Sequence, residues 1–397
     1  MSEMSYLEKL LDGVEVEWVT LGSMADIGTG SSNRQDESEN GIYPFYVRSK
    51  NILKSDTFEF DEVAIVIPGE GGIGDIFHYV EGKYALHQRA YRIRITTNAV
   101  DTKFLYYFMS SSFKQYILTK SVGATSISIR KPMLEGFKVP IPCPNDPEKS
   151  LAIQSEIVRI LDKFTALTAE LTAELNMRKK QYNYYRDQLL SFEGGEVEWK
   201  TLGDIGDVRM CKRILKNETL PEGDVPFYKI GTFGKKANAF ISRDVFEAYK
   251  NKYSFPKKGD VLISASGTIG RTVIYDGEPA YFQDSNIVWL ENDESIVTNK
   301  YLWHFYKIAK WAVSEGGTID RLYNDNIRKT KIIVPYPSDP SKSLAEQNRV
   351  VAILEKFDAL TSSISEGLPR EIELRQKQYE YYRDLLFSFP RPETASN

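Results

Sequence analysis

Apolar side chains recur at alternating steps of four and three residues along two segments, residues 151–192 and 344–389. This alternation is a heptad repeat, which places the apolar positions of a helix along one seam. The seam positions that we expect at the helix interface are Phe164, Leu171, Leu175, Tyr182 and Tyr185 in the first segment and Phe357, Ile364, Leu368, Tyr379 and Tyr382 in the second. The pattern predicts two long helices that pair as a coiled coil.

The first helical segment contains one tetrapeptide twice in succession, Thr168-Ala-Glu-Leu171 and Thr172-Ala-Glu-Leu175. Four residues are about 1.1 helical turns, so one added tetrad lengthens a helix by about 6 Å and rotates its apolar face by only ~40°. The second segment has one extra step of four, from Leu368 to Ile372, which is a stutter. Either the tetrads are a spacer of adjustable length, or they are a replication slip tolerated because it preserves the seam. Pro369, which follows Gly367, should interrupt the second helix, because proline cannot donate a hydrogen bond in a helix interior.

The whole chain is a duplication. Glu15-Val-Glu-Trp18 returns as Glu196-Val-Glu-Trp199, and Tyr184-Tyr-Arg-Asp187 returns as Tyr381-Tyr-Arg-Asp384. The helical segments match closely, whereas the globular segments match only in outline, so one frame is repeated around two different inserts. The beginning of the chain also resembles the end of a helical segment. We therefore expect a closed, circular arrangement with pseudo-twofold symmetry, in which the two helices run antiparallel.

These boundaries predict four parts. They are an N-terminal globular domain at 1–150, a central spacer helix at 151–192, a C-terminal globular domain at 193–343, and a distal helix with a tail at 344–397. The fold class is α+β, with two globular domains alternating with two long helices.

Each insert contains the pattern strand, glycine-rich loop, strand. In the first insert, Val63–Ile67 precedes the loop 68–74, and in the second, Val261–Ser264 precedes the loop 265–271 and the strand Thr272–Tyr275. We interpret these as hairpins in which glycine supplies positive φ. A phosphate-binding loop would be followed by a helix and usually by Gly-Lys-Ser/Thr, and neither occurs here. Further strands are predicted at 84–95 and 280–290, and helices at 103–116 and 300–314.

Composition restricts the class of protein. The chain has 397 residues, a net charge of −4 and two widely separated cysteines, Cys143 and Cys211. It contains no apolar run of the roughly 18 residues that a membrane span requires, and its first residues lack the layout of a signal peptide. We expect a reduced cytoplasmic protein without disulfides. If it binds nucleic acid, it must do so through local basic patches.

Candidate catalytic groups are scarce. The chain has three histidines, and none belongs to a cluster of cysteines or carboxylates with metal-ligand spacing. His78 and His87 are interpreted as surface residues. Gly-x-Ser-x-Gly is absent, and so is the Asn-Pro-Pro-Tyr/Phe motif expected of an adenine methyltransferase. We therefore predict neither catalytic residues nor a metal site.

The divergent inserts carry basic, amide and hydroxyl groups in their loops. Arginine, asparagine and glutamine can pair with base edges, while lysine and serine contact phosphates. The DNA-binding candidates are Arg34, Arg48, Lys50, Gln88, Arg89, Ser126 and Arg130 in the first insert and Lys212, Arg213, Lys229, Lys235, Lys236, Thr268, Arg271, Gln283, Asn286, Thr318 and Arg321 in the second. Each could equally be a solvated surface group. As two different sets on one frame, they suit an asymmetric, two-part DNA site.

The chain as a whole resembles the specificity subunit of type I restriction–modification systems. The features that carry the resemblance are the two divergent inserts, the repeated Gln-Tyr-x-Tyr-Tyr-Arg-Asp that begins at Gln181 and Gln378, and the Thr-Ala-Glu-Leu tandem, which points to the type IC branch. The resemblance implies that each insert is a target recognition domain for one half of a bipartite DNA target, and that the helices space the halves and carry the methyltransferase subunits. One departure is Asp75, at the position of Arg271 in the second insert, and it weakens any DNA-contact role there.

The resemblance also implies partners and cofactors. Catalysis would lie in two modification subunits, which bind S-adenosylmethionine and methylate adenine, and in two restriction subunits, which use ATP and Mg²⁺. This chain would bind double-stranded DNA and no cofactor of its own. The alternatives are a standalone two-domain DNA-binding regulator, an enzyme whose active site lies in the glycine loops, and a coiled-coil scaffold that binds no nucleic acid.

Overall fold

The computed structural model describes residues 6–72, 74–120, 128–192, 195–313, 320–363 and 365–391. The chain forms two compact units. Unit 1 comprises Met1–Thr172 together with Glu371–Asn397, and unit 2 comprises Ala173–Arg370. Each unit therefore combines one globular insert with parts of both helical segments, and the domain boundaries predicted from the sequence remain a prediction.

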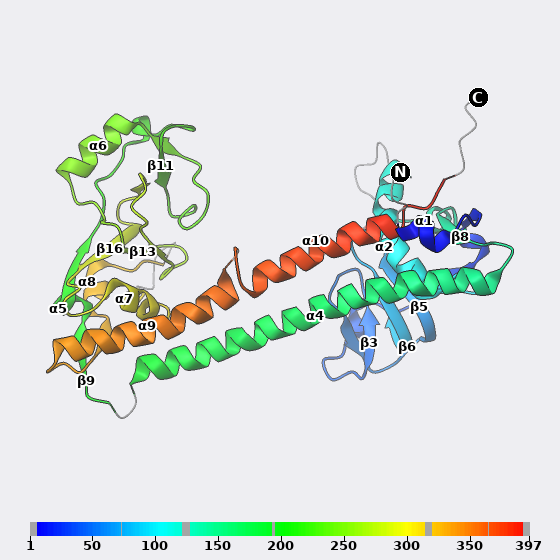
Figure 1. Ribbon diagram of the computed structural model, residues 1–397, viewed down its shortest axis with the longest axis horizontal. Coiled ribbons are helices and arrows are strands. Elements are labelled where there is room, and N and C mark those ends of the chain that lie inside the picture. Colours follow the sequence, from blue (N-terminus) through cyan, green and yellow to red (C-terminus); the bar gives the residue numbers. More distant parts are fainter. Residues whose placement is uncertain are drawn as a thin grey trace. The chain divides into compact units, whose positions relative to one another are not determined.

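Unit 1 is built on a six-stranded sheet (Figure 1). The strand order is β2 (Ala25–Thr29), β7 (Ala90–Ile95), β5 (Phe60–Pro68), β6 (His78–Leu86), β3 (Tyr43–Tyr46) and β4 (Leu53–Ser55). β5 and β6 pair antiparallel from Phe60 opposite Tyr84 to Val66 opposite His78, which confirms the predicted hairpin. Helix α2 (Thr102–Lys120) packs on β5 and β6, and its Phe104 and Phe113 belong to the apolar core of the unit.

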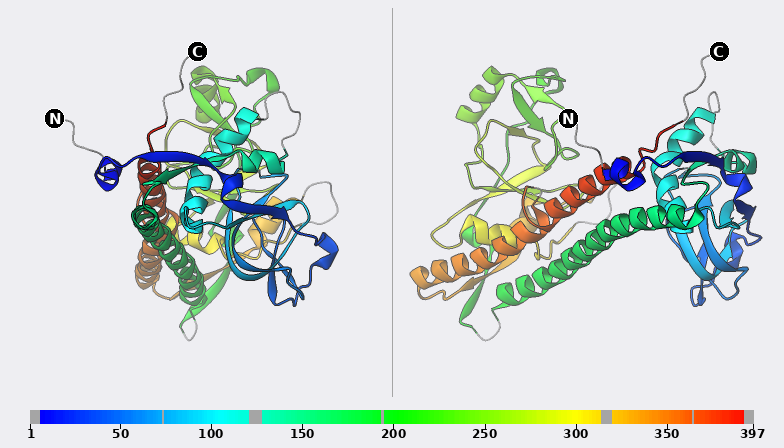
Figure 2. Two further views of the ribbon diagram at one scale, coloured as in Figure 1. Left: turned by 90° about the vertical axis from the view of Figure 1, so that its right-hand side faces the viewer. Right: turned by 45° about the vertical axis from the view of Figure 1, so that its right-hand side comes forward.

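A separate two-stranded ladder joins the insert of unit 1 to the helices. β1 (Val16–Thr20) pairs antiparallel with β8 (Lys138–Pro142), and the short helices α1 (Tyr6–Leu11) and α3 (Lys131–Glu135) lie next to it in sequence. Leu7 shares one apolar cluster with Leu386 and Phe389, and the indole Nε1 of Trp18 donates to the carbonyl of Pro390 at 2.8 Å. Figure 2 shows α1, in blue, beside the red end of the chain's last helix. The predicted circular closure of the chain is confirmed.

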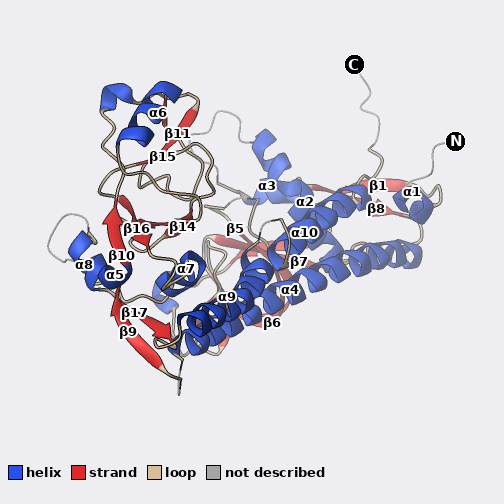
Figure 3. Cartoon of the chain, turned by 60° about the vertical axis from the view of Figure 1, so that its left-hand side comes forward, coloured by secondary structure: helices blue, strands red, loops and turns tan. Residues whose placement is uncertain are grey.

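Unit 2 repeats this plan with different strands and helices. A four-stranded sheet has the order β10 (Gly206–Arg209), β16 (Ile287–Asn292), β13 (Val261–Ser264) and β14 (Thr272–Ile274), and a three-stranded sheet has the order β12 (Phe240–Ile241), β11 (Val225–Tyr228) and β15 (Tyr281–Phe282). The corresponding ladder pairs β9 (Val197–Thr201) with β17 (Lys331–Pro335), as Figure 3 shows near α9. The helices of the insert are α5 (Leu202–Ile205), α6 (Arg243–Lys252), α7 (Asn299–Tyr306) and α8 (Asn324–Lys329).

In unit 2, one predicted helix is shorter than expected and one helix was not predicted. The helix predicted to continue to Ser314 ends at Tyr306, because the amide of Lys307 donates back to the carbonyl of His304 and the Lys307 ammonium is held by Asp358 at 2.8 Å. Helix α6 was not predicted, although Ser242 caps its first turn by accepting from the Val245 amide.

The helical segments pair within each unit. α4 (Pro147–Ser191) is continuous, whereas the second segment is divided into α9 (Pro340–Ser362) and α10 (Leu368–Leu386). Figure 1 shows α10 running opposite to the first half of α4 in unit 1, and α9 running opposite to its second half in unit 2. Gly367 has φ +81°, and a Cβ there would clash with the Ala359 carbonyl oxygen. The predicted interruption next to Pro369 is therefore confirmed.

Aromatic stacking marks the seam in both units. In unit 1, Phe164 stacks on Tyr382 with ring centroids 5.4 Å apart, and in unit 2, Phe357 stacks on Tyr185 at 5.8 Å. Tyr182 also lies against Phe357, at 6.1 Å. The other described seam positions are partly buried: Leu171, Leu175, Leu368 and Tyr379. Ile364 lies outside the described residues. The aromatic pairs thus occupy equivalent places in the two copies.

One buried glutamine fixes the insert to the helix in each unit. In unit 1, Gln154 is fully buried, accepts from the Asp101 amide at 2.8 Å and donates to the Ala99 carbonyl at 3.0 Å. In unit 2, Gln347 makes the same two bonds, to Thr298 and Ile296, both at 2.9 Å. The repeated geometry indicates that this contact positions the insert on its helix.

We expect Gln154→Ala to destabilise unit 1 by about 3 kcal/mol, because two backbone groups then lose their partner and each such loss costs roughly 1–3 kcal/mol. Hydrogen exchange at the Asp101 amide should accelerate by about a hundredfold, while the Thr298 amide in unit 2 stays protected. Gln188→Ala, at an exposed position of the same helix, is the matched control. Equal protection of Asp101 in both variants would contradict the prediction.

A buried histidine, His304, predicts that unit 2 is sensitive to acid. Its ring is fully buried, and neither ring nitrogen has a hydrogen-bond partner among the described residues. Its Nδ1 lies 3.8 Å from Asp358, which would favour protonation, but Lys307 already holds that carboxylate at 2.8 Å. Burial, followed by the charge of Lys307, lowers the pKa of His304 to about 3.

Because the folded pKa lies below the unfolded value of about 6.5, the unfolded chain binds the proton first as pH falls. We expect the free energy of unfolding to be unaffected by His304 above pH ~6.5 and to fall by about 1.4 kcal/mol per pH unit below it. Urea denaturation between pH 7 and pH 5 should show that the free energy of unfolding falls less in His304→Phe than in the parent chain. An identical slope in both proteins would exclude this role.

Candidate nucleic-acid interface

In unit 1, backbone hydrogen bonds hold the loop after β5 against the turn between β6 and β7. The Gly69 amide donates to the Arg89 carbonyl at 2.9 Å, and the Ile129 amide donates to the Gly69 carbonyl at 2.8 Å. The His87 amide donates to the Tyr46 carbonyl at 2.9 Å. These bonds fix the backbone positions of residues 70 and 89 at one end of the sheet.

Unit 2 has the same set of bonds. The Ala265 amide donates to the Asn286 carbonyl at 2.7 Å, the Leu322 amide to the Ala265 carbonyl at 2.8 Å, and the Gln283 amide to the Tyr228 carbonyl at 2.9 Å. Gly69 therefore corresponds to Ala265, and Arg89 corresponds to Asn286. The inserts share a backbone frame that their sequences do not reveal.

The frame carries a different polar pair in each unit. Glu70 follows Gly69 as Ser266 follows Ala265, and both form an isolated antiparallel bridge, to Ser128 and Arg321 respectively. The Glu70 carboxylate accepts from Arg89 Nη1 at 3.1 Å. The Ser266 hydroxyl lies 2.6 Å from the Asn286 Oδ1, to which it donates. One pair is ionic and the other is neutral at equivalent positions.

A basic cluster surrounds the pair in unit 1. Glu70 also accepts from Arg48 Nη1 at 3.0 Å, and a hollow of about 280 Å³ is lined by Arg34, Arg48, Glu70 and His87. The hydrogen bond from Arg89, followed by that from Arg48, lowers the pKa of Glu70. Because two guanidiniums share one carboxylate, most of their N–H donors remain available to a ligand.

The sequence interpretation was wrong about His87. Its side chain is buried, with 8% exposed, because the ring lies against Phe45 and its Nδ1 accepts from the Arg89 amide at 3.0 Å. Burial, then the charges of Arg48 and Arg89, lower its pKa. His87 supports the backbone of Arg89 and does not lie free at the surface.

In unit 2, Asn286 of this pair lines a mixed polar hollow of about 320 Å³. Predicted residues that line it are Arg213, Lys229, Gln283, Asn286 and Arg321. Gln283 Oε1 accepts from the Ile230 amide at 2.9 Å, and Arg213 pairs with Asp284 at 3.0 Å. Among the described residues, the side-chain amino groups of Gln283 and Asn286 make no hydrogen bond. Both residues line the hollow, so these groups are available to donate to a ligand there.

The remaining candidates lie outside the two hollows. Lys50, Gln88 and Arg130 are exposed in unit 1. In unit 2, Lys212 lies 5.4 Å from the Tyr253 ring centre, Arg271 donates to the Phe233 carbonyl, and the exposed candidates are Lys235, Lys236 and Thr268. Ser126 and Thr318 lie outside the described residues. Glu70 and Ser266 were not among the residues predicted from the sequence. Only their position directly after the central strand of each insert distinguishes them from other polar residues.

The described part of the chain contains no group of three or more His, Cys, Asp or Glu side chains placed to hold a metal ion. Cys143 and Cys211 are both buried free thiols, and burial raises the pKa of Cys211 to about 12. Within the described residues, no helix has the length and apolar character needed to cross a membrane.

Comparison with known proteins follows the duplication. A family model described as "Type I restriction modification DNA specificity domain" matches residues 13–178 and 195–374. A putative type I restriction enzyme specificity subunit of Haemophilus influenzae is 47% identical over 97% of this chain and 98% of its own length. The EcoR124I/EcoR124II specificity subunit of Escherichia coli is 40% identical over 100% of both chains. The crystal structure of an S subunit from M. genitalium matches with a TM-score of 0.59 at 18% identity, covering 98% of this chain and 100% of that one, which supports the fold alone.

Proposed function

The chain belongs to the family of type I restriction–modification DNA specificity subunits, and from this premise we propose how it recognises its target. It is a DNA sequence-recognition subunit without catalysis of its own. Each insert reads one half of an asymmetric bipartite sequence. The globular domains at 1–150 and 193–343 are the target recognition domains, and the helices at 151–192 and 344–397 are the spacer.

The observation that carries the proposal is the shared frame with exchanged side chains. Arg89 and Asn286 occupy equivalent backbone positions at the end of equivalent sheets. Arginine pairs bidentately with guanine and asparagine with adenine in the major groove. A common frame would present both residues to the duplex in the same way, so a difference in side chain becomes a difference in the base that is read.

The surrounding cations support backbone contacts. Arg34 and Arg48 lie at the first hollow, and Arg213, Lys229 and Arg321 lie at the second. Such groups neutralise phosphates and fix the register of the protein on DNA without reading sequence. Because the whole chain has a net charge of −4, strong binding by this subunit alone is disfavoured, and the complex with its partners is the binding species.

The partners are the other subunits of a type I restriction–modification enzyme and double-stranded DNA. Two modification subunits would supply S-adenosylmethionine-dependent adenine methylation, and two restriction subunits would use ATP and Mg²⁺. The tandem tetrads suggest a type IC arrangement, in line with the similarity to the EcoR124I/EcoR124II subunit. The comparisons give no support to the alternative of a standalone regulator.

The deciding experiment is an adenine-methylation map of the host genome with and without this gene. We expect a split motif with a fixed gap to disappear when the gene is deleted and to return on complementation. A complementing chain that carries the first insert in both positions should instead methylate a palindromic motif built from one half-site, because two identical readers in a pseudo-twofold frame read a symmetric sequence. Persistence of every methylated motif after deletion, with active modification subunits present, would overturn the proposed function.

A further inference from the structure

Asn33 and Gln88 form a pair of side-chain amides beside the first hollow. The Nε2 of Gln88 donates to the Oδ1 of Asn33. Arg34, which follows Asn33, and His87, which precedes Gln88, both line that hollow. Gln88 is exposed, so the pair adjoins the basic cluster around Glu70 with one of its members open to solvent.

The backbones of both residues are held in place. The Gln88 amide donates to the Ser32 carbonyl at 2.9 Å, and the Ser32 amide donates to the Leu86 carbonyl at 3.2 Å. The Asn33 amide donates to the Asp36 carboxylate at 2.6 Å. A side chain that is already ordered loses less conformational entropy when it binds a ligand. The amide pair is therefore arranged before a ligand is bound.

The side chain of Gln88 keeps a donor and an acceptor free. A glutamine side chain has two N–H donors and a carbonyl oxygen with two lone pairs. The bond to Asn33 uses one donor, and in the described part of the chain this side chain makes no other hydrogen bond. One N–H and the Oε1 oxygen remain. This is the combination that pairs with the ring nitrogen and the amino group of adenine in the major groove.

Leu215 occupies the place of Asn33 in the second insert. Each residue precedes a short 3₁₀ helix, η2 at Arg34–Asp36 and η3 at Lys216–Glu218. In both units the backbone amide donates to the carboxylate three residues later, at 2.6 Å in unit 1 and 2.7 Å in unit 2. The Leu215 side chain is apolar and 54% exposed, so it cannot accept a hydrogen bond. The backbone turn thus forms without an amide pair.

Asp284 occupies the place of Gln88 in the second insert. Each follows the residue whose amide donates to the equivalent tyrosine carbonyl, at Tyr46 in unit 1 and at Tyr228 in unit 2. The Asp284 carboxylate accepts from the Arg213 guanidinium at 3.0 Å. Because unit 2 keeps the frame with other side chains, the frame does not require the amide pair. The bond in unit 1 instead orients Gln88.

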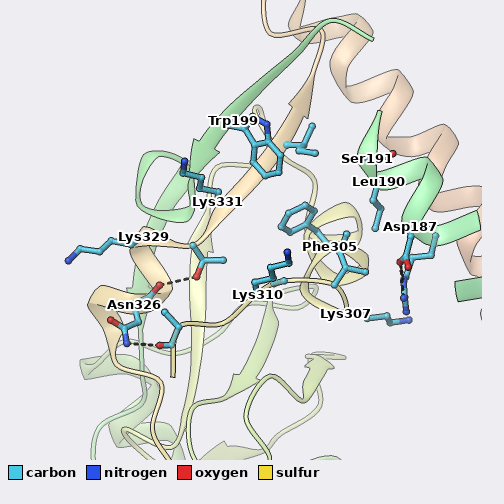
Figure 4. A pocket seen from close by; sticks show the side chains of 16 residues that line it. Asp187, Leu190, Ser191, Trp199, Phe305, Lys307, Lys310, Asn326, Lys329 and Lys331 are labelled. Carbon is cyan, nitrogen blue, oxygen red and sulfur yellow. Dashed lines mark hydrogen bonds and ion pairs between the residues drawn. The ribbon is translucent and has the colours of Figure 1, made fainter. Parts of the chain in front are cut away.

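A larger hollow in unit 2 is not part of this frame. It measures about 860 Å³ and lies between the β9–β17 ladder and the end of α4, with Trp199, Phe305 and Lys331 among the residues that line it (Figure 4). None of the residues that form the shared backbone frame lines it. This hollow therefore offers no further reading position.

We propose that Gln88 reads an adenine in the half-site of the first insert, and that Asn33 is the residue that positions its amide. The inference rests on the proposed function, which makes DNA the ligand of this surface. Gln88 and Arg89 are consecutive, so their Cα atoms lie about 3.8 Å apart, close to the rise of about 3.4 Å between base pairs. The two side chains read two different positions of one half-site.

Gln88→Glu should replace adenine by cytosine at one position of that half-motif. A carboxylate accepts from the amino group of cytosine but cannot donate to the ring nitrogen of adenine, and the Asn33 amide can turn over to donate to it. Gln88→Leu removes both base contacts and should lower discrimination at the same position by about fivefold to 150-fold. The measurement is competition binding of the full chain, assembled with its modification subunits, to duplexes that carry each base at each position of the motif.

Variants of Asn33 separate positioning from a merely structural role. Asn33→Leu introduces the residue of the second insert and should lower discrimination at the same position, because Gln88 loses its orientation. Asn33→Asp keeps an acceptor for the Gln88 amide and should retain the preference for adenine. Gln115→Leu, at an exposed position of α2, is the matched control and should alter no position.

Two results would overturn the inference. One is a Gln88→Leu complex that keeps the parent preference at every position. The other is an equal loss at all positions of the half-site, which would show that the pair only holds the loop. Gln88 is exposed, so its substitutions do not open the core. If the parent complex has no sequence preference at all, the proposed function itself fails, which separates the two cases.

Discussion

Exchanging the Glu70–Arg89 pair for the pair found in the second insert should alter one half of the recognised sequence and leave the other half unchanged. The change is Glu70→Ser with Arg89→Asn, made together so that Glu70 and Arg89 do not leave each other unpaired, while Arg48 loses its contact with Glu70. Loss of one bidentate arginine contact costs roughly 1–3 kcal/mol of base discrimination, or about fivefold to 150-fold. Adenine-methylation mapping of the variant should show a relaxed or substituted base at one position of one half-motif.

The outcome depends on the shared frame and not on charge alone. Lys83→Ala removes an exposed cation from β6 that lies over the Phe58 ring and lines neither hollow, so it should leave the motif intact. The reciprocal change, Ser266→Glu with Asn286→Arg, should alter the other half-motif. If Glu70→Ser/Arg89→Asn methylates the parent motif at the parent rate, Arg89 does not read a base.

The features predictable from the sequence are those encoded by local periodicity. The heptad seam predicted both helical segments, and Gly367 with Pro369 predicted the division between α9 and α10. The repeated tetrapeptides around Trp18 and Trp199 predicted the duplication and the circular closure. Each of these depends on neighbours in sequence, where spacing and backbone restriction act directly.

The equivalence of Arg89 and Asn286 could not be predicted in the same way. It depends on hydrogen bonds between segments about 20 to 60 residues apart, such as Gly69 with Arg89 and Gly69 with Ile129, and the two inserts have diverged around them. The burial of His87 likewise follows from Phe45 on a separate strand. Long-range register is set by the whole sheet. From the sequence, the candidate residues could be chosen only by residue type, and the structure places some of them at the two hollows and the others on the surface around them.

Insertion of a third Thr-Ala-Glu-Leu after Leu175 should lengthen the gap between the half-sites and leave both half-sites unchanged. α4 is continuous from Pro147 to Ser191, so four added residues extend it by about 6 Å and rotate its seam by ~40°. The opposing segment is interrupted between Ser362 and Leu368, where the added length can be absorbed without breaking either aromatic stack. At about 3.4 Å per base pair, the gap should grow by one or two base pairs in the methylation map. The same four residues inserted after Asn40, in an exposed turn of unit 1, should leave the gap as it is. A changed half-site, or an unchanged gap in a variant that still methylates, would show that the tetrads do not measure distance.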